Sequence, residues 1–408
     1  MREATEKINR ELKNSSVFLG LFIVTVFAGG TVGVAARAAD QEMEKLASEI
    51  RWYVIGKVAK PSREKSPRQI AKGLYLTASS ANNPKKLAEI IDLLNRTELN
   101  TVVIDIKDYT GNVLFDSQIT LVKDLNLKKN AFTDLAATIQ KLHDNNIYVI
   151  ARQTVFQDPI LAGQKPEWAI KSKRGGLWHD HKGLAWVDPT KKEVWKYNAA
   201  LAKEAADFGF DELNFDYVRF PSDGNMNDVV YEIKDKKRYE VMGEFFRFLS
   251  KALDKKPVWI SLDMFGFAME RTGENDMNIG QRLVDALDVV DYISPMMYPS
   301  HYPSGHLGLA NPAAFPGLVI ENGMIQGGPF FADARAEVRP WIQAFNIGAV
   351  YDAAKIRAQI DAVEKYPNAG WLLWNAANRY SDAGLFPDER LAGPEEMPII
   401  ARPTTTSG

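Results

Sequence analysis

The chain has 408 residues, of which 46% are hydrophobic and 25% are charged, and it contains no cysteine. This composition is typical of a folded globular protein, and it excludes disulfides, zinc–thiolate sites and iron–sulfur clusters. The formal net charge of −2 lacks the basic surplus of most nucleic-acid-binding proteins, so we expect no nucleic-acid partner.

The N-terminal part of the chain has the pattern of a membrane-targeting segment. Residues 1–16 are polar and include several basic side chains, and residues 17–36 contain no charge. At a rise of about 1.5 Å per residue, that uncharged run spans about 30 Å, which is the thickness of a bilayer core. The preceding basic residues predict a cytoplasmic N-terminus and export of the rest. We expect an uncleaved membrane anchor; a signal peptide cleaved at the A-x-A-like site formed by Ala36 and Ala38 is the alternative.

Two segments are predicted to flank the globular domain. Residues 37–72 contain a short helical pattern and then a basic, proline-containing stretch, which indicates an extended spacer. Residues 391–408 are rich in proline and threonine and are predicted to form a tail. The main domain is therefore expected over residues 73–390.

Within this domain, short β-rich runs alternate with helical patterns. The predicted strands are 73–78, 101–108, 147–156, 212–221, 258–266, 291–300, 340–345 and 370–376. The clearest helical patterns are 84–98, 131–146, 191–209 and 239–253. Strands that alternate with helices form a parallel sheet, and eight repeats predict an α/β fold of the (β/α)8 TIM-barrel type. A doubly wound sheet is disfavoured, because no glycine-rich phosphate turn follows an early strand.

Polar and aromatic side chains gather where these predicted strands end, which is where TIM-barrel enzymes place their active sites. The candidates are Asp105, Lys107, Arg152, Asp216, Arg219, Asp263, Tyr298, Trp374 and Asn375. Because side chains alternate along a strand, Asp105 and Lys107 should point into the barrel mouth, opposite the apolar face of Ile104 and Ile106. A structural ion pair between Asp105 and Lys107 is an equal alternative.

Two aspartates on successive predicted strands are the strongest catalytic candidates. Alternation places Asn214 with Asp216 on one face, and Ser261 with Asp263. A single aspartate at a strand end is most often a turn or helix cap. Several acids that converge on one mouth instead favour function, because burying carboxylates without a purpose costs roughly several kcal/mol each.

Histidines and tryptophans give weaker signals. His179 and His181 form an H-x-H pair in a predicted loop, but no third ligand is evident, so we expect a solvent- or substrate-facing loop, no metal and no cofactor. Flat rings such as Trp374 suit the apolar C–H faces of sugars. Other tryptophans, such as Trp195 in a predicted helix, are expected to fill the core.

Several of these stretches resemble a known family, the DUF4015-type glycosyl hydrolase domain among the glycosidase-like TIM barrels. The resemblance spans about residues 73–380 and is carried above all by FDYVRFPSDG at 215–224 and YISPMMYPSHY at 292–302. A partial likeness to chitinase-type barrels is weaker, because the glutamate acid of their fourth strand is missing and Arg219 lies nearby. Asp216 looks closer to the strand-four nucleophile of amylase-like and α-galactosidase-like barrels.

The resemblance and the acidic pair together predict an exported glycoside hydrolase that acts on a cell-surface or extracellular polysaccharide. Asp216 is the expected nucleophile and Asp263 the expected acid, and their adjacent strands favour the short spacing of a retaining enzyme. The other candidates, including Asn375, are expected to bind substrate. Two alternatives stay open: a non-catalytic carbohydrate-binding barrel of the cell envelope, and a metal-dependent polysaccharide deacetylase that uses His179, His181 and an aspartate.

Overall fold

The computed structural model describes residues 64–129, 132–271 and 273–388. The predicted anchor or signal segment at 17–36 and the predicted tail at 391–408 lie outside these residues. Across the described ranges, no helix is long and apolar enough to cross a membrane.

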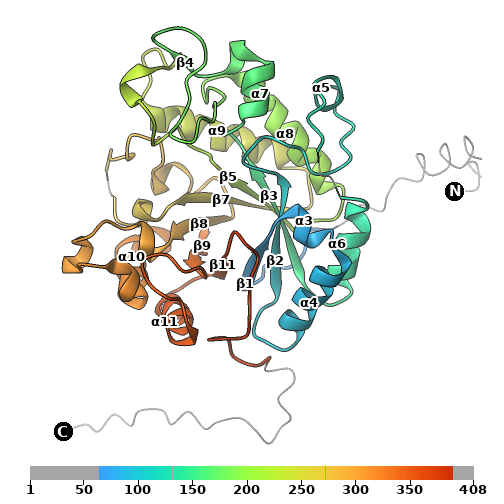
Figure 1. The fold of residues 1–408 in the computed structure, drawn as a ribbon, viewed down its shortest axis with the longest axis vertical. Coiled ribbons are helices and arrows are strands. Elements are labelled where there is room, and N and C mark those ends of the chain that lie inside the picture. The colour runs from blue at the N-terminus through green and yellow to red at the C-terminus, as the bar shows by residue number, and fades with distance from the viewer. Residues whose placement is uncertain (1–63, 130–131, 272, 389–408) are drawn as a thin grey trace, which may run out of the picture. The chain divides into compact units, whose positions relative to one another are not determined.

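A closed barrel of eight parallel strands forms the centre of the described chain (Figure 1). The strands are β1 (Ala71–Leu76), β2 (Thr101–Lys107), β3 (Tyr148–Thr154), β5 (Glu212–Asp216), β7 (Trp259–Phe265), β8 (Tyr292–Met297), β10 (Trp341–Gln343) and β11 (Gly370–Trp374). They pair in this order, and β11 pairs back with β1, which closes the ring. The predicted TIM barrel is therefore confirmed, with a strand at each of the predicted positions.

Some strand boundaries differ from the prediction. Strand β1 begins at Ala71, two residues before the predicted start of the first strand at Gly73. Strand β5 ends at Asp216 rather than Pro221, because the next residue, Tyr217, has a φ of 54° that no strand residue adopts. A short additional strand, β9 (Glu337–Val338), pairs with the start of β8.

Helices surround the barrel, as Figure 1 shows. They are α3 (Ala78–Ala81), α4 (Pro84–Asn95), α5 (Thr120–Asp124), α6 (Leu135–His143), α7 (Pro159–Gln164), α8 (Lys192–Ala206), α9 (Arg238–Leu253), α10 (Pro316–Gly327) and α11 (Ala353–Glu364). Helices α4, α6, α8 and α9 confirm the four helical patterns. Between β7 and β8, the described residues contain only 3₁₀ turns (Gly266–Met269 and Leu283–Asp285), so the strand–helix alternation fails there.

The loops at the carboxyl ends of the strands also pair with one another. Strands β4 (Lys171–Ser172) and β6 (Val229–Val230) form a two-stranded antiparallel sheet between the loops that follow β3 and β5. This pairing ties the two loops together beside the barrel mouth.

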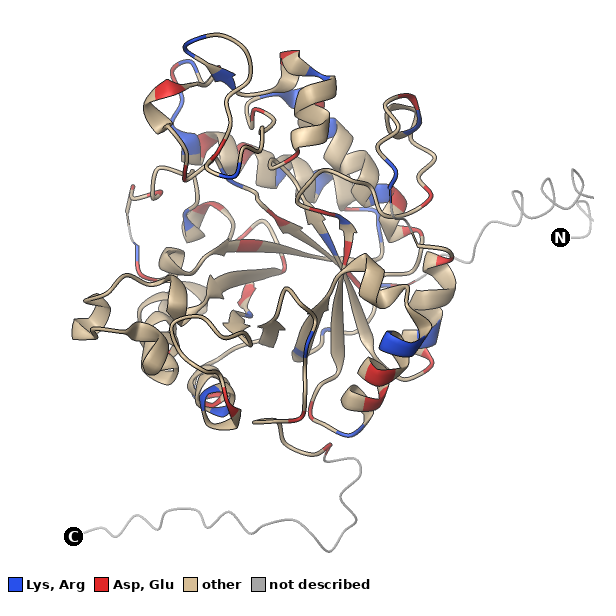
Figure 2. Ribbon diagram, in the orientation of Figure 1, with Lys and Arg blue, Asp and Glu red and all other residues tan. Residues whose placement is uncertain are grey.

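The larger apolar core lies between the barrel and the helices, whereas the barrel interior combines a smaller apolar cluster, which includes Val103, Ile150 and Leu372, with buried charged side chains. Figure 2 shows charged positions on the central strands as well as on the outer helices. Near the base, Glu212 pairs with Arg339 and accepts hydrogen bonds from Ser261 Oγ at 2.5 Å and Tyr148 Oη at 3.1 Å. TIM-barrel interiors are usually filled by branched apolar side chains. Here a polar column leads from the base towards the carboxyl ends of the strands.

Candidate active site

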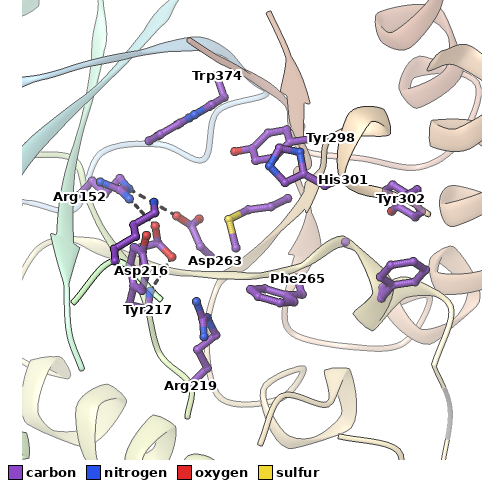
Figure 3. A pocket seen from close by; sticks show the side chains of 14 residues that line it. Arg152, Asp216, Tyr217, Arg219, Asp263, Phe265, Tyr298, His301, Tyr302 and Trp374 are labelled. Carbon is purple, nitrogen blue, oxygen red and sulfur yellow. Dashed lines mark hydrogen bonds and ion pairs between the residues drawn. The ribbon is translucent and has the colours of Figure 1, made fainter. Parts of the chain in front are cut away.

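A cavity of about 510 Å³ lies at the carboxyl ends of the barrel strands (Figure 3). It is lined by Arg152, Lys182, Asp216, Tyr217, Arg219, Asp263, Phe265, Gly266, Phe267, Met296, Tyr298, His301, Tyr302 and Trp374. Its position is that of the active site in TIM-barrel enzymes. Of the predicted site residues, Asp216, Asp263, Arg152, Arg219, Tyr298 and Trp374 line this cavity, and Lys107, Asp105 and Asn375 do not.

Arg152 is the centre of a charged cluster at the cavity floor (Figure 3). Its guanidinium donates from Nη1 to Asp105 Oδ1 at 2.6 Å and from Nη2 to Asp216 Oδ2, and its Nε lies 3.8 Å from Asp263 Oδ2. Burial disfavours the charged guanidinium, but the nearby carboxylates outweigh burial and raise the pKa of Arg152 well above its usual value. Arg152 therefore holds several acids in one small volume rather than offering a free cation to a sugar.

Asp216 has both carboxylate oxygens fixed. Oδ2 pairs with Arg152, and Oδ1 accepts a hydrogen bond from its own neighbour, the backbone N–H of Tyr217, at 2.5 Å. Tyr217 has a φ of 54°, in the left-handed region that non-glycine residues rarely occupy. Backbone strain of this kind gathers at functional sites, where the surroundings hold it in place. The strained turn directs the carboxylate of Asp216 into the cavity.

Asp263 is placed quite differently. Its Oδ1 accepts hydrogen bonds from Asn214 Nδ2 and from Trp341 Nε1, each at 2.8 Å, whereas its Oδ2 has no hydrogen-bond donor within the described residues. Burial, and after it the negative charge of Asp216, raise the pKa of Asp263 to about 8. Asp263 is therefore mostly protonated at neutral pH. A proton-bearing acid beside an ion-paired carboxylate is the arrangement of a general acid and a nucleophile.

Aromatic rings form two sides of the cavity. On one side, Trp374 stacks on Tyr75 with ring centroids 4.1 Å apart, and Tyr298 lies 6.4 Å from Trp374 between centroids. On the other side lie Phe265, Phe267 and Tyr302, of which the last two have centroids 4.6 Å apart. Rings on opposite sides of a polar floor suit a sugar, whose faces are apolar and whose edges carry hydroxyls.

The predicted position of Lys107 in the barrel mouth is wrong. Its Nζ is fully buried, 2.7 Å from Asp158 Oδ2 and 3.0 Å from the carbonyl oxygen of Thr154, and it also contacts Asn198 on α8. The cause is a β-bulge in β2: Asp105 pairs with Arg152 and Lys107 with Gln153, so one residue drops out of the alternation. Lys107 consequently points towards the helices.

Two other predicted substrate-binding residues also lie outside the cavity lining. Asp105 is buried beneath it, where it pairs with Arg152 and accepts a 2.5 Å hydrogen bond from Tyr75 Oη. The amide of Asn375 donates to the carbonyl oxygens of Ala344 and Arg379, at 2.7 and 3.0 Å, and so fixes the turn after β11. Both residues support the site and do not line it.

The histidine pair does not form part of the cavity lining either. His179 pairs with Ala185 in a β-bridge, and His179 and His181 are both exposed. Asp180, between them, accepts hydrogen bonds from Trp186 Nε1 at 3.0 Å and from neighbouring backbone amides. Within the described ranges, no group of three or more His, Asp or Glu side chains is placed to hold a metal ion.

Sequence reasoning missed several lining residues, notably Tyr217, Lys182, Tyr302 and the Phe265–Phe267 turn. The sequence did offer one signal for Tyr217: it directly follows Asp216, the predicted nucleophile at the end of a strand. At Gly266, an added Cβ would lie 2.6 Å from Tyr302 Oη and 2.7 Å from the carbonyl oxygen of Met296. Glycine there lets the turn after β7 pack closely against its neighbours.

Solved structures include one similar barrel that supports the fold, followed here by two weaker matches. The glycoside hydrolase domain of PgaB (BpsB) from Bordetella bronchiseptica is 13% identical with a TM-score of 0.54, and the match covers 78% of this chain and 97% of that one. An α-galactosidase from Thermus thermophilus is 12% identical with a TM-score of 0.48, over 78% of this chain and 60% of the enzyme. A hypothetical protein from Ruminiclostridium thermocellum ATCC 27405 is 40% identical with a TM-score of 0.43, over 47% of this chain and 96% of that one.

Comparison with curated protein sequences gave no match. The family DUF4015, described as "Putative glycosyl hydrolase domain", matches residues 73–380, which include all eight barrel strands except the first residues of β1. The cavity, its acidic pair and its aromatic walls all lie within that range. The chain therefore belongs to the DUF4015 family of glycosyl hydrolase domains.

Proposed function

We propose that this protein is a retaining glycoside hydrolase in which Asp216 is the nucleophile and Asp263 the general acid and base. The observation that carries the proposal is the contrast between two carboxyl groups around one guanidinium. Asp216 is ion-paired with Arg152, whereas burial keeps the proton on Asp263. Glycosidases need one carboxyl group of each kind on opposite sides of the scissile bond.

The reaction proceeds in two displacements. In the first, a carboxylate oxygen of Asp216 bonds to the anomeric carbon, the glycosidic C–O bond breaks, and the proton of Asp263 passes to the departing oxygen. In the second, water attacks the same carbon, gives a proton back to Asp263 and releases Asp216. In the resting enzyme, the ion pair with Arg152 balances the negative charge of Asp216.

For the substrate, we propose a cell-surface or extracellular polysaccharide. The opposed aromatic walls suit successive sugar rings, and the predicted anchor or signal segment at 17–36 supports export. Protease added to intact cells should degrade the domain of the full-length protein, and the protein should sediment with membranes or, if cleaved, be secreted. Recovery of the uncleaved chain from the soluble cytoplasm would contradict export.

The mechanism is tested with a panel of polysaccharides, followed by NMR of the first anomer released. Retention of configuration and a 2-fluoroglycosyl adduct on the peptide that contains Asp216 are the expected results. Release of the inverted anomer would exclude the covalent step. Saturable binding of a glycan without any turnover would favour the non-catalytic carbohydrate-binding alternative instead.

A further inference from the structure

A second guanidinium in the cavity, that of Arg219, has surroundings unlike those of Arg152. Arg152 contacts three aspartates. Arg219 instead donates from Nη1 to the carbonyl oxygen of Phe220 at 3.0 Å and to Ser222 Oγ at 3.3 Å. Within the described part of the chain it has no carboxylate at ion-pair distance, and its Nε and Nη2 donate no hydrogen bond. One edge of this guanidinium is therefore free.

Aromatic rings hold this arginine in place. Its Cζ lies 4.9 Å from the ring centroid of Trp186, 5.2 Å from that of Tyr217 and 4.7 Å from that of Phe265. Only 8% of Arg219 is exposed. Stacking on rings orients a guanidinium and removes its water, but it supplies no full negative charge. A cation that is both desolvated and lacking a carboxylate partner is costly unless an anion binds to it.

The charges of Asp216, Asp223 and Asp180 reach Arg219 only from beyond ion-pair distance. The positive charge of Arg152 is already matched by its aspartates. Lys182 also lines the cavity and has no ion-pair partner among the described residues. Arg219 and Lys182 thus leave a positive surplus on the lining, next to a carboxyl group, Asp263, that carries a proton at neutral pH.

We propose that Arg219 binds the acidic group of an anionic sugar, and that a uronic acid carboxylate is the best-fitting ligand. The inference rests on the proposed function and names its substrate class. The Nε and Nη2 hydrogens lie side by side in one plane and match the two oxygens of a carboxylate. Arg219 follows Asp216 closely in the chain and packs on the intervening Tyr217, so the acidic sugar lies at or next to the catalytic pair.

Binding of small sugars to the full-length protein tests this directly. The probes are sodium glucuronate, glucose 6-phosphate and neutral glucose, measured by calorimetry or ligand-observed NMR. We expect glucuronate to bind about 10-fold or more tightly than glucose, and Arg219→Gln to abolish that preference. Arg219→Lys keeps the positive charge but loses the planar guanidinium edge, so it should retain only part of the preference for glucuronate.

Arg238→Gln is the matched control, because Arg238 also packs on rings, those of Phe220 and Tyr231, but does not line the cavity. It should leave the preference for glucuronate unchanged. Thermal unfolding of each variant reports whether the fold is intact, and Arg219→Lys carries the test if Arg219→Gln does not fold.

Equal binding of glucuronate and glucose, or a preference that survives in Arg219→Gln, would overturn the proposal. Tighter binding of glucose 6-phosphate than of glucuronate would overturn the assignment of a carboxylate. These binding measurements do not depend on catalysis, so they test the inference separately from the proposed function. Anion binding through Arg219 without cleavage of any glycan would refute the proposed function alone, whereas cleavage of neutral glycans without anion binding would refute this inference alone.

Discussion

The indole of Trp341 donates a 2.8 Å hydrogen bond from Nε1 to Asp263 Oδ1, and so links β10 to β7 past the intervening β8. Asn214 donates to the same oxygen. Both donors stabilise the ionised carboxylate and so oppose the effect of burial on its pKa. The two oxygens of Asp263 consequently have separate roles: Oδ1 is anchored, and Oδ2 is left to carry the proton.

Replacing Trp341 with phenylalanine should raise the pKa of Asp263 further, because the ionised form loses a donor. The alkaline limb of a pH–rate profile, or the ¹³C NMR titration of the Asp263 carboxyl, should move to higher pH. Trp371→Phe is the control, since Trp371 donates to Glu364 on α11 and not to Asp263. An unchanged or lower pKa in Trp341→Phe would show that this hydrogen bond does not tune the acid.

The folded protein should lose stability as pH rises from about 4 to about 8 because of Asp263. An unfolded aspartate releases its proton near pH 3.9, whereas burial raises the pKa of folded Asp263 to about 8, so the folded state binds the extra proton in between. Asp263→Asn removes this loss. Its free energy of unfolding relative to the parent should increase across that range, by about 1.4 kcal/mol per pKa unit of the shift, and then level off.

Urea unfolding of both proteins at pH 5, 7 and 9 measures this difference. Asp223→Asn, which replaces an exposed aspartate of the loop after β5, is the control for the loss of one carboxyl group. A difference between Asp263→Asn and its parent that is constant with pH would mean that Asp263 ionises normally in the fold.

Asp216→Asn should reduce turnover by about 1,000-fold or more, because no covalent intermediate can form. Arg152 keeps its ion pair with Asp105 in this variant, so the variant should still fold. The measurement is the steady-state rate on whichever glycan the panel identifies, together with the thermal unfolding midpoint. Asp223→Asn serves again as the neighbouring acid outside the cavity lining. Turnover at the parent rate would remove Asp216 from the nucleophile role.

Lys107→Met should destabilise the fold by about 3–5 kcal/mol, because it leaves Asp158 buried without its cation. Sugar affinity of the protein that remains folded should be unchanged, since Lys107 does not line the cavity. Adding Asp158→Asn should restore part of the stability, as denaturant unfolding of the single and double variants will show. A drop in sugar affinity with unchanged stability would return Lys107 to the binding site.

The barrel could be predicted because its strands are short, buried β-rich runs separated by helical patterns. The same alternation placed Asp216 and Asp263 inside the barrel, where both line the cavity. It failed for Lys107 because a bulge leaves no mark in the residue pattern. The role of Arg152 was equally hidden, since a contact between one arginine and aspartates of three strands depends on tertiary structure.

The bulge in β2 also makes the length of that strand as important as its composition. With one residue out of alternation, Asp105 faces the cavity floor while Lys107 faces α8. A single-residue deletion between them would remove the bulge and leave the lysine opposite Gln153, still on the helix side. Straightening the bulge without a deletion would instead turn the ammonium group into the catalytic mouth and leave Asp158 without its cation. Relatives of this chain should therefore be aligned here by strand pairing, with the aspartate opposite Arg152 and the lysine opposite Gln153, because a one-residue gap between the two would leave both side chains on the faces that they occupy in this chain.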